Sequence, residues 1–272
     1  MTKVGQRRFA ALVGLILSTS LTVMSCAQTN VPTAPDTMPE ATTTELTVSV
    51  AASVQDVMQA VQAAYQVEAP TISITYNFGS SGSLAQQIIQ GAPTDIFLSA
   101  SQKWMDDVEA KGLIEEDSRH NLLLNALVLI VPLETTKLTD LSDLTPDKVN
   151  RVSIGEPESV PAGRYSKEAL ASLGLFDALQ PKMVFGKDVR QVLSYVETGN
   201  VDAGLVYATD ANVSERVQRV ATIPAESHSP IVYPIALIAD RENSEAAQDF
   251  VDFLSSDTAT AIFEEYGFAM AE

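Results

Sequence analysis

Short strand-like runs alternate with helix-like segments along most of the chain, and this alternation constrains the fold more than any other feature. Residues 45–50 alternate apolar and polar side chains, and apolar residues from Val54 to Tyr65 follow directly at helical spacing. A second strand is predicted over residues 71–76, again with a helix after it. Repeated strand–helix units are typical of α/β folds, in which helices cover both faces of mostly parallel sheets.

The same pattern continues almost to the end of the sequence. Further strands are predicted over residues 96–99, 126–131, 151–154, 182–185, 204–207 and 231–239, and further helices over residues 84–89, 102–111, 166–173, 189–197, 210–213, 244–254 and 258–266. One open sheet seldom holds so many units, so we expect two α/β lobes with a ligand cleft between them. Lobe 1 is predicted to comprise residues 45–127 plus 233–272, and lobe 2 residues 128–232.

The N-terminal segment has the pattern of a secretory signal peptide rather than of part of the fold. Three basic residues precede an apolar run over residues 9–17, and Cys26 follows a serine. We expect residues 1–25 to be a lipoprotein-type signal peptide, Cys26 to carry lipid, and residues 26–44, with their three prolines, to form a tether. A plain signal peptide cut elsewhere is the alternative. The mature protein is therefore expected outside the cytoplasm, in the periplasm or at the cell surface, with lipidation anchoring it to the membrane.

Charge and composition exclude several classes of function. The chain has Lys+Arg 17 against Asp+Glu 35, a formal net charge of −18. Nucleic acid is excluded as the main partner, because its recognition needs clustered basic residues. One cysteine and two histidines cannot assemble a structural Cys/His zinc site. The sequence also lacks a phosphate-binding G-x-x-x-x-G-K-[S/T] loop, and we expect no cofactor.

Polar or glycine-rich segments stand at four predicted strand-to-helix junctions, namely at Ser53, at Ser81, at residues 160–164 and at residues 186–189. In open α/β sheets, ligands bind beyond the carboxyl ends of strands, and helix N-termini present unpaired N–H groups that bind anions. Ser53 stands where a helix N-cap belongs, with Asp56 as its capping-box partner. The junctions could converge on one oxyanion, although each serine could also be only a cap.

The Gly-Ser-Ser-Gly-Ser run around Ser81 raises an alternative of a different class, an extracytoplasmic serine hydrolase that uses Ser53 or Ser81. The run lacks the G-x-S-x-G spacing of a nucleophile elbow. His120 and His228 both lie in polar segments with no evident partner. The sequence therefore favours a binding protein over an enzyme.

Several segments, taken in order, resemble the periplasmic molybdate-binding proteins of ABC transporters, which have the type II solute-binding fold. The resemblance runs from about Leu46 to Phe268, so it covers essentially the whole predicted mature domain. The segments that carry it are Ala51-Ala52-Ser53 and residues 78–84, 91–100, 160–165, 188–193, 202–207 with 210–211, and 233–235.

The resemblance implies a two-lobed, monomeric, non-enzymatic receptor that captures molybdate or tungstate and delivers it to a membrane permease. In that family two serine side chains with their amides, two further backbone amides and a tyrosine hydroxyl hold the oxyanion. Matched motif by motif, these roles fall on Ser53, Ser81, Ala162, Val189 and Tyr207. Molybdenum or tungsten would be present only within the oxyanion, without direct protein ligands.

The residue types at these positions suit such a ligand. Molybdate near neutral pH is a fully deprotonated dianion whose oxygens only accept hydrogen bonds, and serine, tyrosine and backbone N–H groups supply donors. A site for protonated phosphate would need a carboxylate, and the nearest one, Asp188, is expected to cap a helix. A receptor for sulfate or another tetrahedral oxyanion is the alternative within binding proteins. Arg164 is expected either at the rim of the site or as an exposed helix-start residue.

Overall fold

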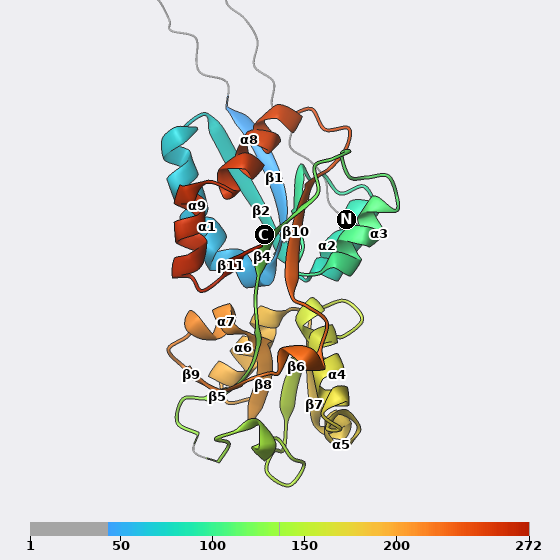
Figure 1. Cartoon of the computed structure of the whole chain (residues 1–272), viewed down its shortest axis with the longest axis vertical. Coiled ribbons are helices and arrows are strands. Elements are labelled where there is room, and N and C mark those ends of the chain that lie inside the picture. Colours follow the sequence, from blue (N-terminus) through green and yellow to red (C-terminus); the bar gives the residue numbers. More distant parts are fainter. Residues whose placement is uncertain (1–42, 136, 272) are drawn as a thin grey trace, which may run out of the picture. The chain divides into compact units, whose positions relative to one another are not determined.

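The computed structural model describes residues 43–135 and 137–271. The predicted signal peptide, Cys26 and the predicted tether up to residue 42 lie outside these ranges. The described residues belong to one compact unit, which contains two β-sheets with helices packed beside them (Figure 1). None of the described helices is both long enough and apolar enough to cross a membrane.

The first sheet has six strands in the order β11-β4-β10-β3-β1-β2. Strand β1 pairs in parallel with both β2 and β3. Strand β10 is antiparallel to β3 and β4, and β11 is antiparallel to β4. The bounds are β1 Thr44–Ala51, β2 Ile72–Gly79, β3 Ile96–Leu98, β4 His120–Leu124, β10 Val232–Leu237 and β11 Ala269–Met270.

The second sheet has five strands in the order β7-β6-β8-β5-β9. Strand β6 is parallel to β7 and β8, whereas β5 is antiparallel to β8 and β9. The bounds are β5 Leu127–Pro132, β6 Val152–Gly155, β7 Met183–Gly186, β8 Ala203–Tyr207 and β9 Val217–Thr222. Strands β5 and β8 are almost wholly buried, so they form the centre of this part of the core.

The helices follow the strands in the expected alternation. The α-helices are α1 Gln55–Glu68, α2 Ser81–Ile89, α3 Gln102–Glu109, α4 Pro161–Ser172, α5 Phe176–Leu179, α6 Val189–Glu197, α7 Ala208–Asn212, α8 Ser244–Leu254 and α9 Asp257–Glu265. Short 3-10 helices are η1 Ala52–Val54, η2 Leu141–Asp143, η3 Gln180–Lys182 and η4 Ala225–Ser227. Helices α1, α8 and α9 pack together beside the first sheet (Figure 1).

The α/β class with two sheets flanked by helices is confirmed, but the sheets are mixed rather than mostly parallel. Strands β4, β9 and β11 were not predicted from the sequence, and all three pair antiparallel with their neighbours. Strand β4 ends in three consecutive leucines, β9 has one buried residue, and β11 has two residues in all. None of them shows the period-two alternation that identifies a strand.

The chain passes between the two sheets at two crossings, residues 125–126 after β4 and residues 223–231 after β9. The backbone N–H of Asn125 donates to the carbonyl of Ile231 at 3.2 Å. The N–H of Ile223 donates to the carbonyl of Leu127 at 2.9 Å. The first of these hydrogen bonds joins the two crossings, and the second joins the start of the longer crossing to β5.

Helix α4 begins in direct backbone contact with β6. A Cβ atom at Gly163 would lie 2.0 Å from the carbonyl oxygen of Gly155, which is far inside van der Waals contact. Only glycine fits at this position. The close approach fixes the first turn of α4, which includes Ala162, against the end of β6.

Replacing Gly163 with alanine is therefore expected to lower the free energy of unfolding by about 3 kcal/mol, because a clash with backbone cannot be relieved by a rotamer change. Gly79→Ala is the matched control, since a Cβ atom there would lie 3.4 Å from Leu84 Cδ2, an ordinary contact. Urea unfolding of both variants measures the difference. Equal stability of the two variants would contradict this account of the packing.

Candidate functional site

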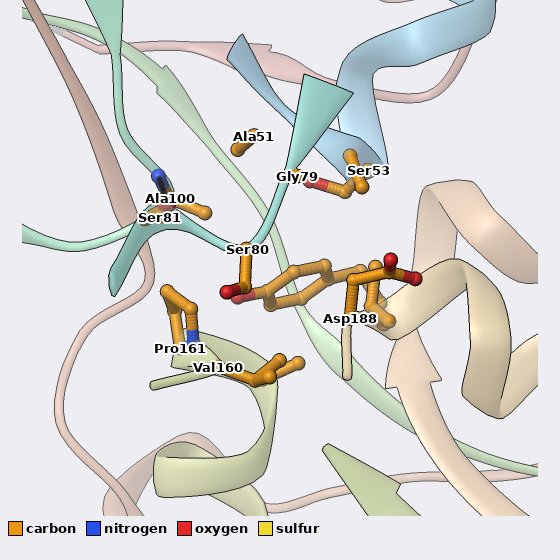
Figure 2. Close-up of a pocket in the computed structure, with 13 residues that line it drawn as sticks. Ala51, Ser53, Gly79, Ser80, Ser81, Ala100, Val160, Pro161 and Asp188 are labelled. Atoms are coloured by element: carbon orange, nitrogen blue, oxygen red, sulfur yellow. Dashed lines mark hydrogen bonds between the residues drawn. The ribbon is translucent and has the colours of Figure 1, made fainter. Parts of the chain in front are cut away.

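A small pocket lies between the first sheet and the second (Figure 2). The volume in which the centre of a water-sized sphere can move is about 10 Å³. A cavity needs about this volume to hold one water molecule. The pocket is lined by Ala51, Ala52, Ser53, Gly79, Ser80, Ser81, Ala100, Val160, Pro161, Ala162, Asp188, Val189 and Tyr207.

All five residues predicted to hold an oxyanion are in this lining. Ser53 lies in η1 directly after β1, and Ser81 opens α2 after β2. Ala162 lies in the first turn of α4, Val189 opens α6, and Tyr207 ends β8. The structure thus brings together two residues that follow strands of the first sheet and three that follow or end strands of the second, while their role in binding stays a prediction.

The local prediction that Ser53 caps a helix is wrong. The residue at the cap of α1 is Val54, which makes no side-chain capping bond. The Ser53 hydroxyl instead lies 2.9 Å from the hydroxyl of Tyr233 in β10. Asp56, the expected capping-box partner, forms an ion pair with Arg190. Both polar groups find partners that are distant in sequence, and these partners replace the local capping bonds.

The second serine, Ser81, is held by the end of a neighbouring strand. Its hydroxyl oxygen accepts the backbone N–H of Ala100 at 2.9 Å, and Figure 2 shows the two residues side by side at the pocket. Since the oxygen acts as the acceptor in this bond, the hydroxyl proton is left for another acceptor. Ser81 is therefore prepared to donate.

Two lining residues act as helix caps. The carboxylate of Asp188 accepts the N–H of Gln191 at 2.8 Å, so its predicted role as the cap of α6 is confirmed. Ser80 caps α2 by accepting the N–H of Ser83 at 3.3 Å. Ser80 was not among the predicted site residues, although a serine directly before a helix start is a capping signal in the sequence.

The hydroxyl of Tyr207 has no hydrogen-bond partner within the described residues, although the residue is only 1% exposed. Burial raises the pKa of Tyr207 well above its ordinary value, so the hydroxyl keeps its proton. Leaving such a donor unsatisfied costs about 1–3 kcal/mol. Buried unpaired polar groups are uncommon in native proteins, so this hydroxyl indicates an acceptor supplied by a ligand.

Backbone and side-chain contacts join the two sides next to the pocket. The N–H of Gly82 in α2 donates to the carbonyl of Ser159 at 3.0 Å. Arg164 is not among the lining residues of the described pocket. Its guanidinium donates to Ser101 Oγ at 2.9 Å and lies 3.7 Å from the carboxylate of Glu168. Arg164 therefore links α4 to the segment that follows β3.

Arg190 is a residue of the site that the sequence analysis missed. It follows Val189 in α6, and its guanidinium donates to the carbonyl of Ser53 at 3.3 Å and to the carboxylate of Asp56. Its Nε atom lies 2.9 Å from the carboxylate of Asp210. Arg190 thus connects a helix start beside the second sheet to the segment after β1. Its position beside Val189 was the only sequence signal available.

Asp210 is a fully buried carboxyl group in α7 beside this arginine. It accepts the backbone N–H of Tyr207 at 3.2 Å. Burial raises the pKa of Asp210 to about 7, and the Arg190 guanidinium and the Tyr207 N–H oppose this rise. The folded protein therefore binds a proton at Asp210 at pH values where the unfolded chain has lost it.

Two mixed sheets joined by paired crossings, with a small pocket lined from both, define a solute-binding protein. The sequence agrees: the chain belongs to the family of bacterial extracellular solute-binding proteins and matches it over residues 46–269. Members of this family are solute-binding proteins that bacteria place outside the cell.

Individual relatives are similar over most of their length. A Bacillus subtilis protein provisionally named the ABC transporter substrate-binding lipoprotein YvgL is 46% identical, over 82% of this chain and 85% of its own. The molybdate-binding protein ModA of Escherichia coli is 40% identical, over 83% of this chain and 89% of its own. A solved substrate-binding domain, provisionally attributed to a molybdenum ABC transporter of Clostridium difficile, is 41% identical with a TM-score of 0.67, covering 85% of this chain and 100% of that one.

The raised pKa of Asp210 predicts a specific pH dependence of stability. Between its ordinary value of 3.8 and about 7, folding takes up a proton at this residue, so the free energy of unfolding falls as pH rises through this range and levels off above it. Asp210→Asn lacks this contribution. Urea unfolding across the pH range should show the stability of the parent falling relative to that of the variant, and a constant difference would contradict the assignment.

Proposed function

We propose that this protein captures molybdate or tungstate outside the cytoplasm and delivers it to the permease of an ABC transporter. Relatives that are 40% identical or more carry names that refer to molybdate or to ABC transport. In this proposal the protein is a monomeric receptor rather than an enzyme and needs no cofactor. Lipid on Cys26 anchors it to the membrane surface, with residues 26–44 as the tether.

The observation that carries the proposal is the buried hydroxyl of Tyr207, which has no hydrogen-bond partner among residues 43–135 and 137–271. It shares the pocket with the free proton of Ser81 and with the helix starts at Ala162 and Val189, whose first-turn N–H groups lack intrahelical acceptors. A fully deprotonated tetrahedral anion can accept from all of these donors at once. Hydrogen bonds to a charged partner contribute about 1.5–3 kcal/mol each, which offsets the loss of hydration.

The acidic character of the chain does not oppose such a ligand inside the pocket. The formal net charge is −18, but salt limits the field of surface charges to about 8–10 Å. Oriented backbone and hydroxyl dipoles then dominate at short range. The carboxylate that lines the pocket, Asp188, already accepts the N–H of Gln191, so its charge is turned toward a helix start.

The contacts of the histidines give no support to a serine hydrolase. His120 Nδ1 lies 3.2 Å from the carbonyl of Ser118, and His228 Nδ1 lies 2.8 Å from the carbonyl of Ser229. Within the described ranges neither imidazole is hydrogen bonded to Ser53 or Ser81. A receptor role therefore fits the pocket better than nucleophilic catalysis, which needs a base beside the serine.

A series of oxyanions tests the choice of ligand. Molybdate and tungstate are expected to raise the melting temperature of the purified protein, with about 2.7 kcal/mol of stabilisation at a ligand concentration one hundred times Kd. Sulfate and phosphate at equal concentration are expected to leave it unchanged, and titration calorimetry supplies the affinities. Equal stabilisation by sulfate would favour the alternative of a general tetrahedral-oxyanion receptor.

Tyr207→Phe separates ligand binding from stability. Removing the hydroxyl should weaken molybdate binding roughly tenfold or more. The stability of the unliganded protein should stay unchanged or rise, because a buried donor without an acceptor is removed.

Tyr76→Phe is the matched control, since the Tyr76 hydroxyl donates to the carbonyl of Met58 at 3.1 Å and Tyr76 is not a lining residue of the pocket. That variant should lose about 1 kcal/mol of stability and keep its affinity. Unchanged affinity in Tyr207→Phe would argue against the proposed site.

A further inference from the structure

The hydroxyl of Ser53 has a protein partner, and the direction of that hydrogen bond decides whether Ser53 can donate to a ligand. The oxygen atoms of Ser53 and Tyr233 lie 2.9 Å apart, and both residues are buried. If Ser53 donated to Tyr233, it would have no proton left for the pocket. If Tyr233 donates, the proton of Ser53 is free. The surroundings of Tyr233 distinguish the two cases.

The first determinant is the side-chain amide of Asn125, in the crossing after β4. The backbone N–H of Ala126 donates to one terminal atom of this amide at 2.9 Å. An N–H can donate only to the carbonyl oxygen, so the other terminal atom is the NH2 group. That group donates to Thr209 Oγ1 at 2.9 Å and to the hydroxyl oxygen of Tyr233 at 3.3 Å. Both amide protons are thereby used.

The second determinant is the protonation of Tyr233. Burial raises the pKa of Tyr233 well above its ordinary value, so the phenol stays protonated. Its oxygen accepts from Asn125, and its own proton needs a separate acceptor. Within the described residues, the remaining hydrogen-bond partner of this hydroxyl is Ser53 Oγ. Tyr233 therefore donates to Ser53.

We propose that Asn125 and Tyr233 are positioning residues that turn the Ser53 hydroxyl into a donor toward the bound oxyanion. The inference rests on the proposed function and deepens it. Neither residue is among those that line the pocket, so both would act on the ligand through Ser53. The protons run in one order, from the Asn125 amide to Tyr233, from Tyr233 to Ser53, and from Ser53 into the pocket. Each bond in such a chain polarises the next.

The two serines of the pocket then follow one design. Ser81 accepts the backbone N–H of Ala100, and Ser53 accepts the hydroxyl proton of Tyr233. In both cases a protein group donates a hydrogen bond to the serine oxygen, and the serine hydroxyl proton remains available for the ligand. A site of this kind favours anions that carry no proton of their own.

A double-mutant cycle tests the proposal by calorimetric titration with sodium molybdate. Tyr233→Phe is expected to weaken binding about five- to tenfold in the otherwise unchanged protein, the loss of one polarising hydrogen bond. In the Ser53→Ala background the same change should have almost no effect, because Tyr233 acts through Ser53. An equal loss in both backgrounds would mean a merely structural role and would overturn the proposal, as would unchanged affinity in the first comparison.

Tyr76→Phe is again the control, a partly buried tyrosine whose hydroxyl bond lies elsewhere. Melting of each unliganded variant checks that it folds. If Tyr233→Phe does not fold, Asn125→Asp takes its place in the same cycle. The introduced carboxylate keeps the bond from Ala126 but accepts the proton of Tyr233, which reverses the order and draws the Ser53 proton away from the pocket. A loss that requires Ser53 supports the proposal, and a loss independent of Ser53 contradicts it.

The titration of the unaltered protein keeps this test separate from the choice of ligand. If the protein binds sulfate and not molybdate, the cycle is run with sodium sulfate, and the positioning role is judged on that anion. If the protein binds none of molybdate, tungstate and sulfate, the positioning role falls together with the proposed function.

Discussion

The pocket depends on one physical constraint: protons buried within it must meet an acceptor that the described part of the protein does not supply. Tyr207 shows the constraint most directly, because its hydroxyl is buried and unpaired. Ser81 adds a proton left over from the bond with Ala100. The helix starts after β6 and β7 add backbone N–H groups at the same place. An anion without protons satisfies all of these groups together, which is why the arrangement points to a ligand rather than to packing.

The sequence predicted what local patterns encode. Helices α6 and α8 have the predicted bounds, because apolar spacing is a local signal, joined at α6 by the capping residue Asp188. Four of the five predicted site residues, all but Tyr207, stand at strand-to-helix junctions that are also local patterns, whereas Tyr207 was assigned only through the resemblance to the molybdate-binding family; all five line one pocket. The partners that orient them were not predictable in this way: Ser53 and Tyr233 are 180 residues apart in sequence. The antiparallel strands β4 and β9 were missed because neither alternates buried and exposed residues: β4 ends in three leucines and β9 has one buried residue.

Arg190 lies next to the pocket and also joins the side of the first sheet to the side of the second. It follows the lining residue Val189 directly and donates to the carbonyl of Ser53, another lining residue. Its ion pairs with Asp56 and Asp210 place two carboxylates around one guanidinium. The group as a whole carries at most one negative charge, and the buried Asp210 gives up part of that charge as its pKa approaches neutrality. A single side chain thus holds two walls of the site together.

The backbone contact between Gly82 and Ser159 determines how closely the two sides approach each other beside the pocket. The two segments meet with a 3.0 Å hydrogen bond and no side chain between them, and a Cβ atom at Gly82 would lie 2.4 Å from the Ser159 oxygen. Two peptide groups in van der Waals contact cannot approach further, since a backbone contact cannot be relieved by a change of side-chain rotamer. Main-chain geometry therefore sets the distance between the start of α2 and the segment before α4, and a larger residue at position 82 would push these two segments apart.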